Sequence, residues 1–205
     1  MENNNLFPLF YLGNIEYYAE IAKHKAIVFE QHEHFPKQTY RSRCEILGPN
    51  GKLKLVLPLA KPNSRQVVKS VQLSTTDNWQ KIHWKSLESA YRSSPYFEYY
   101  EHEFYPFFHT QQHSLFSFNL ELHQLILQLL QIDIDYTLST KYKPTLGKDY
   151  RTFFNSKKES ANTKLKENTY IQVFNDRMEF QPNISVVDLL FNEGPNSLTY
   201  LRDIT

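Results

Sequence analysis

The chain has little cysteine and little glycine, with one cysteine and five glycines among its 205 residues. A single cysteine, Cys44, excludes an intrachain disulfide framework and a metal site built from cysteines alone. The few glycines form no Gly-rich phosphate loop and no GxGxxG dinucleotide fingerprint, and no Gly-x-Ser-x-Gly elbow is present. The sequence therefore lacks the motifs of several common nucleotide-binding and hydrolase folds.

The chain also has little excess charge of either sign and no long apolar run. Its 23 Lys and Arg residues balance 22 Asp and Glu residues, so the net charge is +1. This balance excludes a broadly basic nucleic-acid surface, and we expect no nucleic-acid partner. The apolar segments are far shorter than the ~20 residues of a spanning helix, and residues 1–5 are polar, unlike a signal peptide. We therefore expect a cytoplasmic protein without membrane insertion.

What the sequence does contain is enough apolar material for a core, because 40% of its residues are hydrophobic and 15% are aromatic. This length suits one domain, so we predict a single domain over residues 1–205. Strand-like and helix-like periodicities both occur and predict an α+β fold. In that fold a small mixed or antiparallel sheet packs with helices from residues 77–131 and with a C-terminal helix.

The clearest local prediction is a β-hairpin near residues 39–59. Residues 39–47 and 53–59 alternate between two faces, and the turn between them contains Asn50-Gly51, which tolerates positive φ. Cys44 lies on the apolar face, so we interpret it as a packing residue. Further strands are expected at residues 26–29, 67–73 and 134–138.

Helical spacing predicts several helices. They are expected over residues 13–23, 77–93 and 114–131 and, after a Ser185 cap, up to Gly194. Asp77 and Gln80 resemble a capping box, and Pro106 is expected to break the aromatic-rich segment 96–108. Residues 155–168 are rich in Lys, Asn and Ser, which predicts a mobile loop.

A first candidate site follows the strand predicted at 26–29. On an extended chain Arg41 and Arg43 point the same way, about 6.5–7 Å apart. Two guanidiniums at that spacing can hold a phosphate, a diphosphate or a carboxylate through forked hydrogen bonds, and Lys37 adds a charge from the loop. The alternative is a solvated hairpin face with Glu45 as the counter-charge, and two arginines alone favour that alternative.

Two histidines precede these arginines. On a strand His32 and His34 would share a face, which is one way to build a metal site. No third ligand is evident at useful spacing, so we expect no metal and no cofactor. A general base is the better functional interpretation of one of them, because the reference pKa of histidine lies near the working pH.

A second candidate site lies on the helix predicted over 77–93. His83 shares a mostly apolar ridge with Trp79, so spacing alone favours a core histidine. The functional alternative is a proton-transfer group whose pKa burial lowers. Glu88 and Tyr91 lie on the neighbouring ridge of the same helix.

The segments 11–13, 37–44, 78–91, 94–100 and 185–195 occur in an order that resembles the WbqC-like protein family, in the form common in Bacteroidota. The resemblance covers nearly the whole chain, although Ser42 stands where Asn is usual. By position, the family's polar motif residues are Gln31, Lys37, Gln38, Tyr40, Arg41, Arg43, His83, Glu88 and Tyr91.

The resemblance implies a role in surface-polysaccharide (O-antigen) or amino-sugar biosynthesis, because some members of the family sit among genes for these pathways. On this hypothesis the protein is a transferase that moves an acyl or aminoacyl group to a nucleotide-linked sugar. The catalytic residues would be His83, Glu88 and His32. The anionic ligand, a nucleotide sugar or an acyl donor, would be bound by Gln31, Lys37, Gln38, Tyr40, Arg41, Arg43 and Tyr91.

The alternative is a non-catalytic ligand-binding or protein-binding module of the same pathway. The enzyme hypothesis requires that the arginines and His83 line one cleft, and residues 155–168 are candidates for a lid over it.

Overall fold

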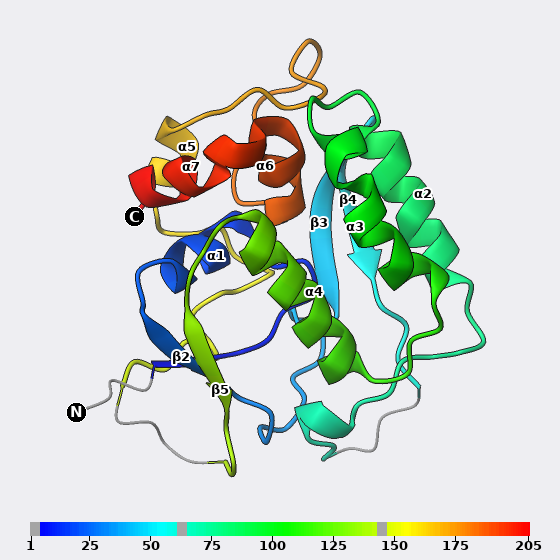
Figure 1. Ribbon diagram of the computed structural model, residues 1–205, viewed down its shortest axis with the longest axis vertical. Helices are drawn as coiled ribbons and strands as arrows, with labels where there is room; N and C mark the ends of the chain where they lie inside the picture. The colour runs from blue at the N-terminus through cyan, green and yellow to red at the C-terminus, as the bar shows by residue number, and fades with distance from the viewer. Residues whose placement is uncertain (1–4, 61–64, 143–146) are drawn as a thin grey trace.

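The computed structural model describes residues 5–60, 65–142 and 147–205 (Figure 1). Its strands are β1 (Asn5–Phe7), β2 (Ala26–Phe29), β3 (Arg43–Gly48), β4 (Gly51–Val56) and β5 (Asp135–Leu138). Its α-helices are α1 (Ile15–Ile21), α2 (Trp79–Tyr91), α3 (Phe97–His109), α4 (Leu115–Leu129), α5 (Lys164–Glu167), α6 (Val186–Glu193) and α7 (Ser197–Asp203). Two 3₁₀ turns are η1 (Val68–Ser70) and η2 (Gly194–Asn196). The predicted α+β class is confirmed.

The strands form two separate sheets instead of one. One is a parallel sheet of order β1-β2-β5, and the other is the antiparallel pair β3-β4. Parallel neighbours need a crossover connection. Helix α1 supplies it between β1 and β2, and the hairpin with α2, α3 and α4 lies between β2 and β5. The parallel sheet therefore brings the start of the chain against its middle.

The predicted hairpin is confirmed as β3 and β4, which pair from Arg43 opposite Val56 to Gly48 opposite Gly51. Gly51 has a φ of 108°, which suits glycine in a tight turn. The hairpin begins later than expected because the chain turns before it. The Tyr40 carbonyl accepts a hydrogen bond from the backbone N–H of Tyr11 (2.9 Å) and so is not available to β4.

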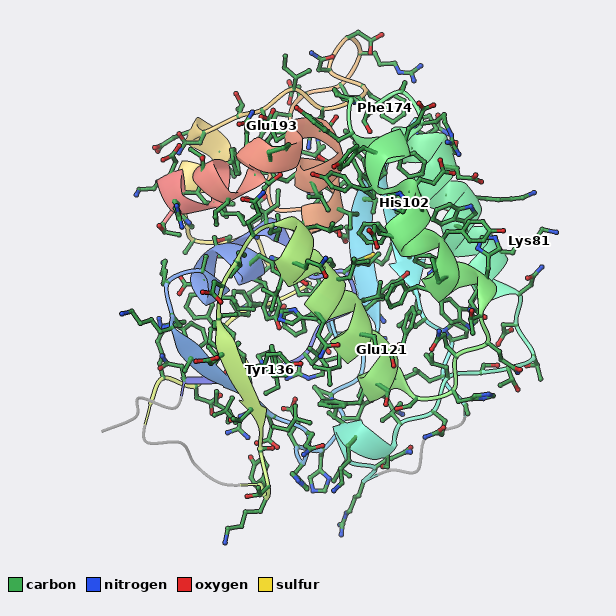
Figure 2. All side chains as sticks on the ribbon, viewed as in Figure 1. Lys81, His102, Glu121, Tyr136, Phe174 and Glu193 are labelled. Atoms are coloured by element: carbon green, nitrogen blue, oxygen red, sulfur yellow. The ribbon has the colours of Figure 1, made fainter. Side chains whose placement is uncertain are left out.

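The helices cover the hairpin from two sides. In Figure 1, α2 and α3 lie together on one side of it, and β3 contacts α2 on that side and α6 on the other. The main core cluster draws residues from nearly the whole length of the chain and is rich in Tyr and Phe. A smaller cluster joins Phe174, at the top of Figure 2, with Leu47 and Ile184.

Two local predictions are wrong, each for a physical reason. Residues 67–73 make η1 and isolated bridges instead of a strand, because the N–H of Leu73 donates to the His113 carbonyl. The Asp77–Gln80 capping box is absent, because the Gln80 amide is used elsewhere. It donates to the carbonyl of Phe107 near the end of α3 (3.2 Å) and to the carbonyl of Thr110 just after α3 (2.5 Å).

Pro106 does not break the aromatic helix. It lies inside α3, which continues to His109. Pro106 has no backbone N–H to donate to the preceding turn, which removes one helical hydrogen bond. Only one turn of α3 follows the proline, and the helix continues through that turn.

The C-terminal helix is confirmed, with Ser185 accepting a hydrogen bond from the N–H of Val187 and Gly194 ending α6 at a φ of 52°. The following α7 was not predicted.

Within residues 155–168 the structure has helix α5 with a buried Leu165; the mobility of this segment stays a prediction. Within the described ranges, no helix has both the length and the apolar character needed to span a bilayer.

Candidate functional site

The parallel sheet places a buried carboxylate at its carboxyl edge. Glu30 follows β2, and Ser139 follows β5. Glu30 Oε1 accepts hydrogen bonds from the Ser139 hydroxyl (3.0 Å) and from the backbone N–H of His32 (2.5 Å). Its Oε2 has no hydrogen-bond partner among the described residues and lies 4.0 Å from Nη1 of Arg151. Parallel sheets often bind ligands at this edge, but here the protein's own polar groups fill it.

Arg41 is engaged inside the molecule. Its Nε and Nη2 lie 2.7 Å and 2.6 Å from Oε1 of Glu33, and Nη2 also donates to the Arg151 carbonyl (3.1 Å). Burial raises the pKa of Glu33 and lowers the pKa of Arg41, while the attraction between the two groups opposes both shifts. Anion binding by Arg41 stays a prediction, and it would require this buried pair to open.

Arg43 does not share a strand with Arg41. Residues 39–42 form turns, whereas Arg43 begins β3. Arg43 is half-buried, and its Nε has no hydrogen-bond partner among the residues that the structure describes. Glu45, the proposed counter-charge, instead lies 3.3 Å from Lys54 across the hairpin. The extended-chain geometry that would pair the two guanidiniums is therefore not present.

The loop residues before Arg41 lie between the sheet edge and the surface. The Gln31 amide donates to the Ser139 carbonyl (2.7 Å), which fixes it against the end of β5. Lys37 and Gln38 are exposed. The Gln38 carbonyl accepts a hydrogen bond from the Ser156 hydroxyl (3.0 Å), which ties this loop to a distant part of the chain.

The two loop histidines differ in their surroundings. His32 is half-buried, and His34 is exposed with its Nδ1 3.1 Å from the Arg65 carbonyl. Across the described ranges, no three His, Cys, Asp or Glu side chains group closely enough to hold a metal ion. A general-base role for His32 stays a prediction.

His83 lies in the core. It is 4% exposed, its Nδ1 is 2.8 Å from the Tyr11 hydroxyl, and its ring meets that of Trp79 edge-on. Burial lowers the pKa of His83 to about 4, although a hydrogen bond to the backbone of Val56 opposes the shift. The ring is therefore neutral near pH 7, as both interpretations expect, and its low exposure is what favours the core interpretation. A catalytic role for His83 stays a prediction, and the burial counts against it.

The other two residues of the α2 motif lie apart. Glu88 is on the surface, 3.0 Å from Arg92. Tyr91 is buried under β3, where its hydroxyl accepts a weak hydrogen bond from the Leu47 N–H (3.4 Å). No hydrogen bond or ion pair joins His83 or Glu88 to Arg41 in the part of the chain that the structure describes.

Tyr40 lines a cavity on the surface of the protein. This cavity, about 610 Å³ in volume, lies between Tyr40, the hairpin and the segments 156–166 and 179–183. Its volume falls within the range of about 300–1,000 Å³ typical of small-molecule sites. Burial raises the pKa of the Tyr40 phenol, so Tyr40 stays neutral and can donate or accept a hydrogen bond.

The cavity wall is rich in cations. The lining contains four lysines, Lys52, Lys157, Lys158 and Lys166, and three glutamates, Glu45, Glu159 and Glu179. Lys166 is paired with Glu159 at 2.9 Å. Within the described ranges, the Nζ atoms of Lys157 and Lys158 have no hydrogen bond or ion pair. Both lysines are exposed, so their charges are not neutralised by a described neighbour.

Side-chain contacts hold the lysine-bearing segment in place. The Asn155 side chain accepts a hydrogen bond from the Lys157 N–H (2.9 Å), which makes a local turn. Further along, the Ser160 hydroxyl donates to Glu16 (2.5 Å) at the start of α1, and the Asn162 amide donates to the Ile204 carbonyl (2.9 Å). The cavity wall is thus anchored to both ends of the chain.

The buried carboxylate of Asp188 was not predicted from the sequence. Asp188 Oδ2 accepts hydrogen bonds from the Tyr170 hydroxyl (2.6 Å) and the Gln172 amide (2.9 Å). Burial raises the pKa of Asp188 to about 6, although these hydrogen bonds oppose the shift. Gln172 also makes two hydrogen bonds to the Gln181 backbone and so fixes one side of the cavity. The spacing of Asp188 three residues after the helix-capping Ser185 was the available signal.

Comparison with known proteins identifies the family. The model of the WbqC-like protein family matches residues 10–171. The chain belongs to the WbqC-like protein family. A relative from Mycobacterium tuberculosis (strain ATCC 25618 / H37Rv), "Uncharacterized protein Rv1507c", is 26% identical over 195 aligned positions, covering 82% of this chain and 84% of that protein. No solved structure matches the chain.

The WbqC-like match includes most of the cavity wall. Tyr40, Lys52 and the segment 156–166 lie inside the matched residues, and the segment 179–183 lies after them. The cavity is therefore built mainly from the WbqC-like part of the chain and is closed by its C-terminal part.

Proposed function

We propose that this WbqC-like protein binds a nucleotide-linked sugar in the lysine-lined cavity and acts in surface-polysaccharide or amino-sugar biosynthesis. The observation that carries the proposal is the cavity of about 610 Å³ with Lys157 and Lys158 unpaired on its wall. Lysine ammonium groups are common ligands of phosphate oxygens. A diphosphate is the anion that a nucleotide-linked sugar presents.

The other residues of the wall suit the sugar. Tyr40, Gln181 and Asn183 line the cavity and supply neutral hydrogen-bonding groups. The Asn183 side chain is already held by Asn14 and Glu16, which fixes the shape of this wall. Sugar hydroxyl and amide groups are recognised by such fixed polar groups. The proposal therefore places the sugar near Tyr40 and the diphosphate near the lysines.

The reaction that we propose is acyl or aminoacyl transfer to an amine of the bound sugar. It rests on the pathway that the family resemblance implies, not on a catalytic set at the cavity. A non-catalytic sugar-nucleotide binding protein is the second candidate. The burial of His83, the main predicted proton acceptor, favours this second candidate.

Calorimetric titration tests the binding proposal. Uridine diphosphate N-acetylglucosamine and inorganic pyrophosphate are titrated into the full-length protein and into the double variant Lys157→Ala/Lys158→Ala. Loss of two charge-assisted hydrogen bonds should weaken binding of both ligands by about tenfold or more. Lys81→Ala is the matched control, because Lys81 is an exposed lysine at the edge of Figure 2 opposite α5.

Binding that is equally strong in the double variant and in the parent would remove the cavity as the site. Incubation of the protein with the sugar nucleotide and acetyl-coenzyme A, followed by mass spectrometry, separates the two candidates. An acylated sugar nucleotide supports the transferase. Tight binding without turnover, for this donor and for aminoacyl donors, supports the binding protein.

A further inference from the structure

A second cavity adjoins the lysine-lined one. It has a volume of about 320 Å³ and shares Thr169 and Phe180 with the first cavity, so the two cavities are neighbours at these residues. Both are open to solvent in the described structure, and neither depends on the sheet-edge cluster around Glu30.

The lining of the second cavity has a different chemistry. Its apolar groups are Leu47, Tyr170, Ile171, Met178 and Phe180. It contains no lysine, arginine or carboxylate, whereas the first cavity has seven charged side chains. An anion therefore favours the first cavity, and an uncharged ring or chain favours the second.

Two aromatic rings make one corner of the second cavity. The rings of Phe180 and Tyr170 meet edge to face, with centroids 5.1 Å apart and planes at 85°. The Tyr170 hydroxyl is held by Asp188, so this corner is fixed before any ligand arrives. Such a corner offers a π-face to a flat ring, and stacking of a nucleobase on an aromatic side chain is a common source of affinity.

Two polar side chains of the second cavity, Thr169 and Asn175, are exposed and make no hydrogen bond in the described part of the chain. The Gln172 amide is occupied by Asp188 and Gln181, whereas the Asn175 amide is free within that part. An amide can donate to and accept from the edge of a base. An acyl chain has no such edge, so the free Asn175 favours a base over a chain.

We infer that the second cavity holds the base of a nucleotide whose phosphates occupy the lysine-lined cavity, with Phe180 as the residue that stacks on the base. This inference rests on the proposed function, because it assigns the two parts of the proposed ligand to two cavities. It makes Phe180 and Asn175 specificity-determining residues and Lys157 and Lys158 anion-binding residues.

Methionine-methyl NMR tests this inference directly. The chain has two methionines, and Met178 lines the second cavity, so ¹³C-methyl-methionine labelling gives one resonance at the site and Met1 as a reference. Uridine diphosphate and adenosine diphosphate should shift the Met178 resonance through the ring current of the base. Pyrophosphate should bind without that shift.

Two variants separate this inference from the proposed function. Phe180→Leu keeps apolar volume but removes the π-face, and Asn175→Ala changes an exposed loop residue with little risk to folding. Phe180→Leu should weaken nucleotide binding by about tenfold, the size of one lost base stack. Asn175 lines the second cavity and not the first, so Asn175→Ala should weaken nucleotide binding by about fivefold, the size of one lost hydrogen bond, and leave pyrophosphate affinity unchanged.

Nucleotide binding with no Met178 shift, or equal affinity of the nucleotides for Asn175→Ala, Phe180→Leu and the parent, would overturn the inference and leave the lysine-lined cavity in place. A Met178 shift caused by an acyl donor but by neither nucleotide would assign the second cavity to an acyl chain instead. Failure of pyrophosphate and nucleotides to bind at all would overturn the proposed function as well.

Discussion

Replacing Arg41 with alanine removes a cation whose partner has little access to water. The side chains of Arg41 and Glu33 are 3% and 11% exposed, and the Glu33 carboxylate also feels the nearby charge of Glu30. Breaking a buried ion pair by removing one partner costs about 3–5 kcal/mol. In a chain of this length about 1 kcal/mol lowers Tm by 2–4 °C, so we expect Arg41→Ala to lower Tm by about 6–20 °C.

Urea denaturation followed by circular dichroism measures the free energy of unfolding. The double variant Arg41→Met/Glu33→Leu should recover much of the loss, because apolar replacement of both partners of a buried pair is often nearly neutral. Arg92→Ala is the control, since the Arg92–Glu101 pair is largely exposed and such pairs contribute at most about 1 kcal/mol. A loss below about 1 kcal/mol in Arg41→Ala, together with loss of ligand binding, would refute the structural role and favour the predicted anion-binding role.

Three further predictions concern buried or strained positions. The raised pKa of Asp188, about 6 when folded, means that the folded state holds this proton more tightly, so its stabilising contribution is complete below pH ~4 and is lost as the pH rises to about 6. Relative to Asp188→Asn, the parent should therefore lose about 2 kcal/mol of unfolding free energy between these values and about 3 kcal/mol in all once the pH is well above the folded pKa; a difference that does not change with pH would contradict the burial. The imidazole of His83 should show no NMR titration above about pH 5, because its pKa is about 4, and a midpoint near about 6.5 would mean that water reaches the ring. Gly194→Ala should lower the unfolding free energy by more than about 1 kcal/mol, because φ is 52° and the new Cβ would lie 2.6 Å from the Tyr96 ring; an unchanged Tm would rule out that strain.

The hairpin could be predicted because its information is local. Alternating side chains and the Asn50-Gly51 turn are adjacent in the sequence, and β3 and β4 pair around that turn, although β3 begins only at Arg43. The parallel sheet could not be predicted in the same way. β1 has three residues, too few for a periodicity, and it pairs with β2 only after α1 has carried the chain back.

The environment of the Arg41 side chain depends on contacts that the spacing of residues in the sequence does not reveal. The sequence contains both Arg41 and Glu33, but Gln38 has a φ of 60° and residues 39–42 form turns, so Arg41 lies outside the strand that Arg43 begins. The alternative given for the two arginines, a solvated hairpin face with Glu45 as the counter-charge, does not describe Arg41 either, because Arg41 is buried and its counter-charge is Glu33.

The cavity was the least predictable feature. The composition of residues 155–168 indicated a loop, but nothing local in that segment says which surface it covers. Its position over Tyr40 comes from side-chain hydrogen bonds to Glu16 and Ile204, which lie far away in the sequence. Tyr40 itself was among the predicted binding residues, but its neighbours in the cavity, Lys157 and Lys158, were not.

The most direct test is a crystal structure of the protein in complex with uridine diphosphate N-acetylglucosamine. We expect a phosphate oxygen within about 2.7–3.2 Å of the Nζ atom of Lys157 or Lys158, with the sugar against Tyr40. A diphosphate bound at the sheet edge near Arg151, or at any surface remote from these lysines, would contradict the assignment of the cavity as the ligand site.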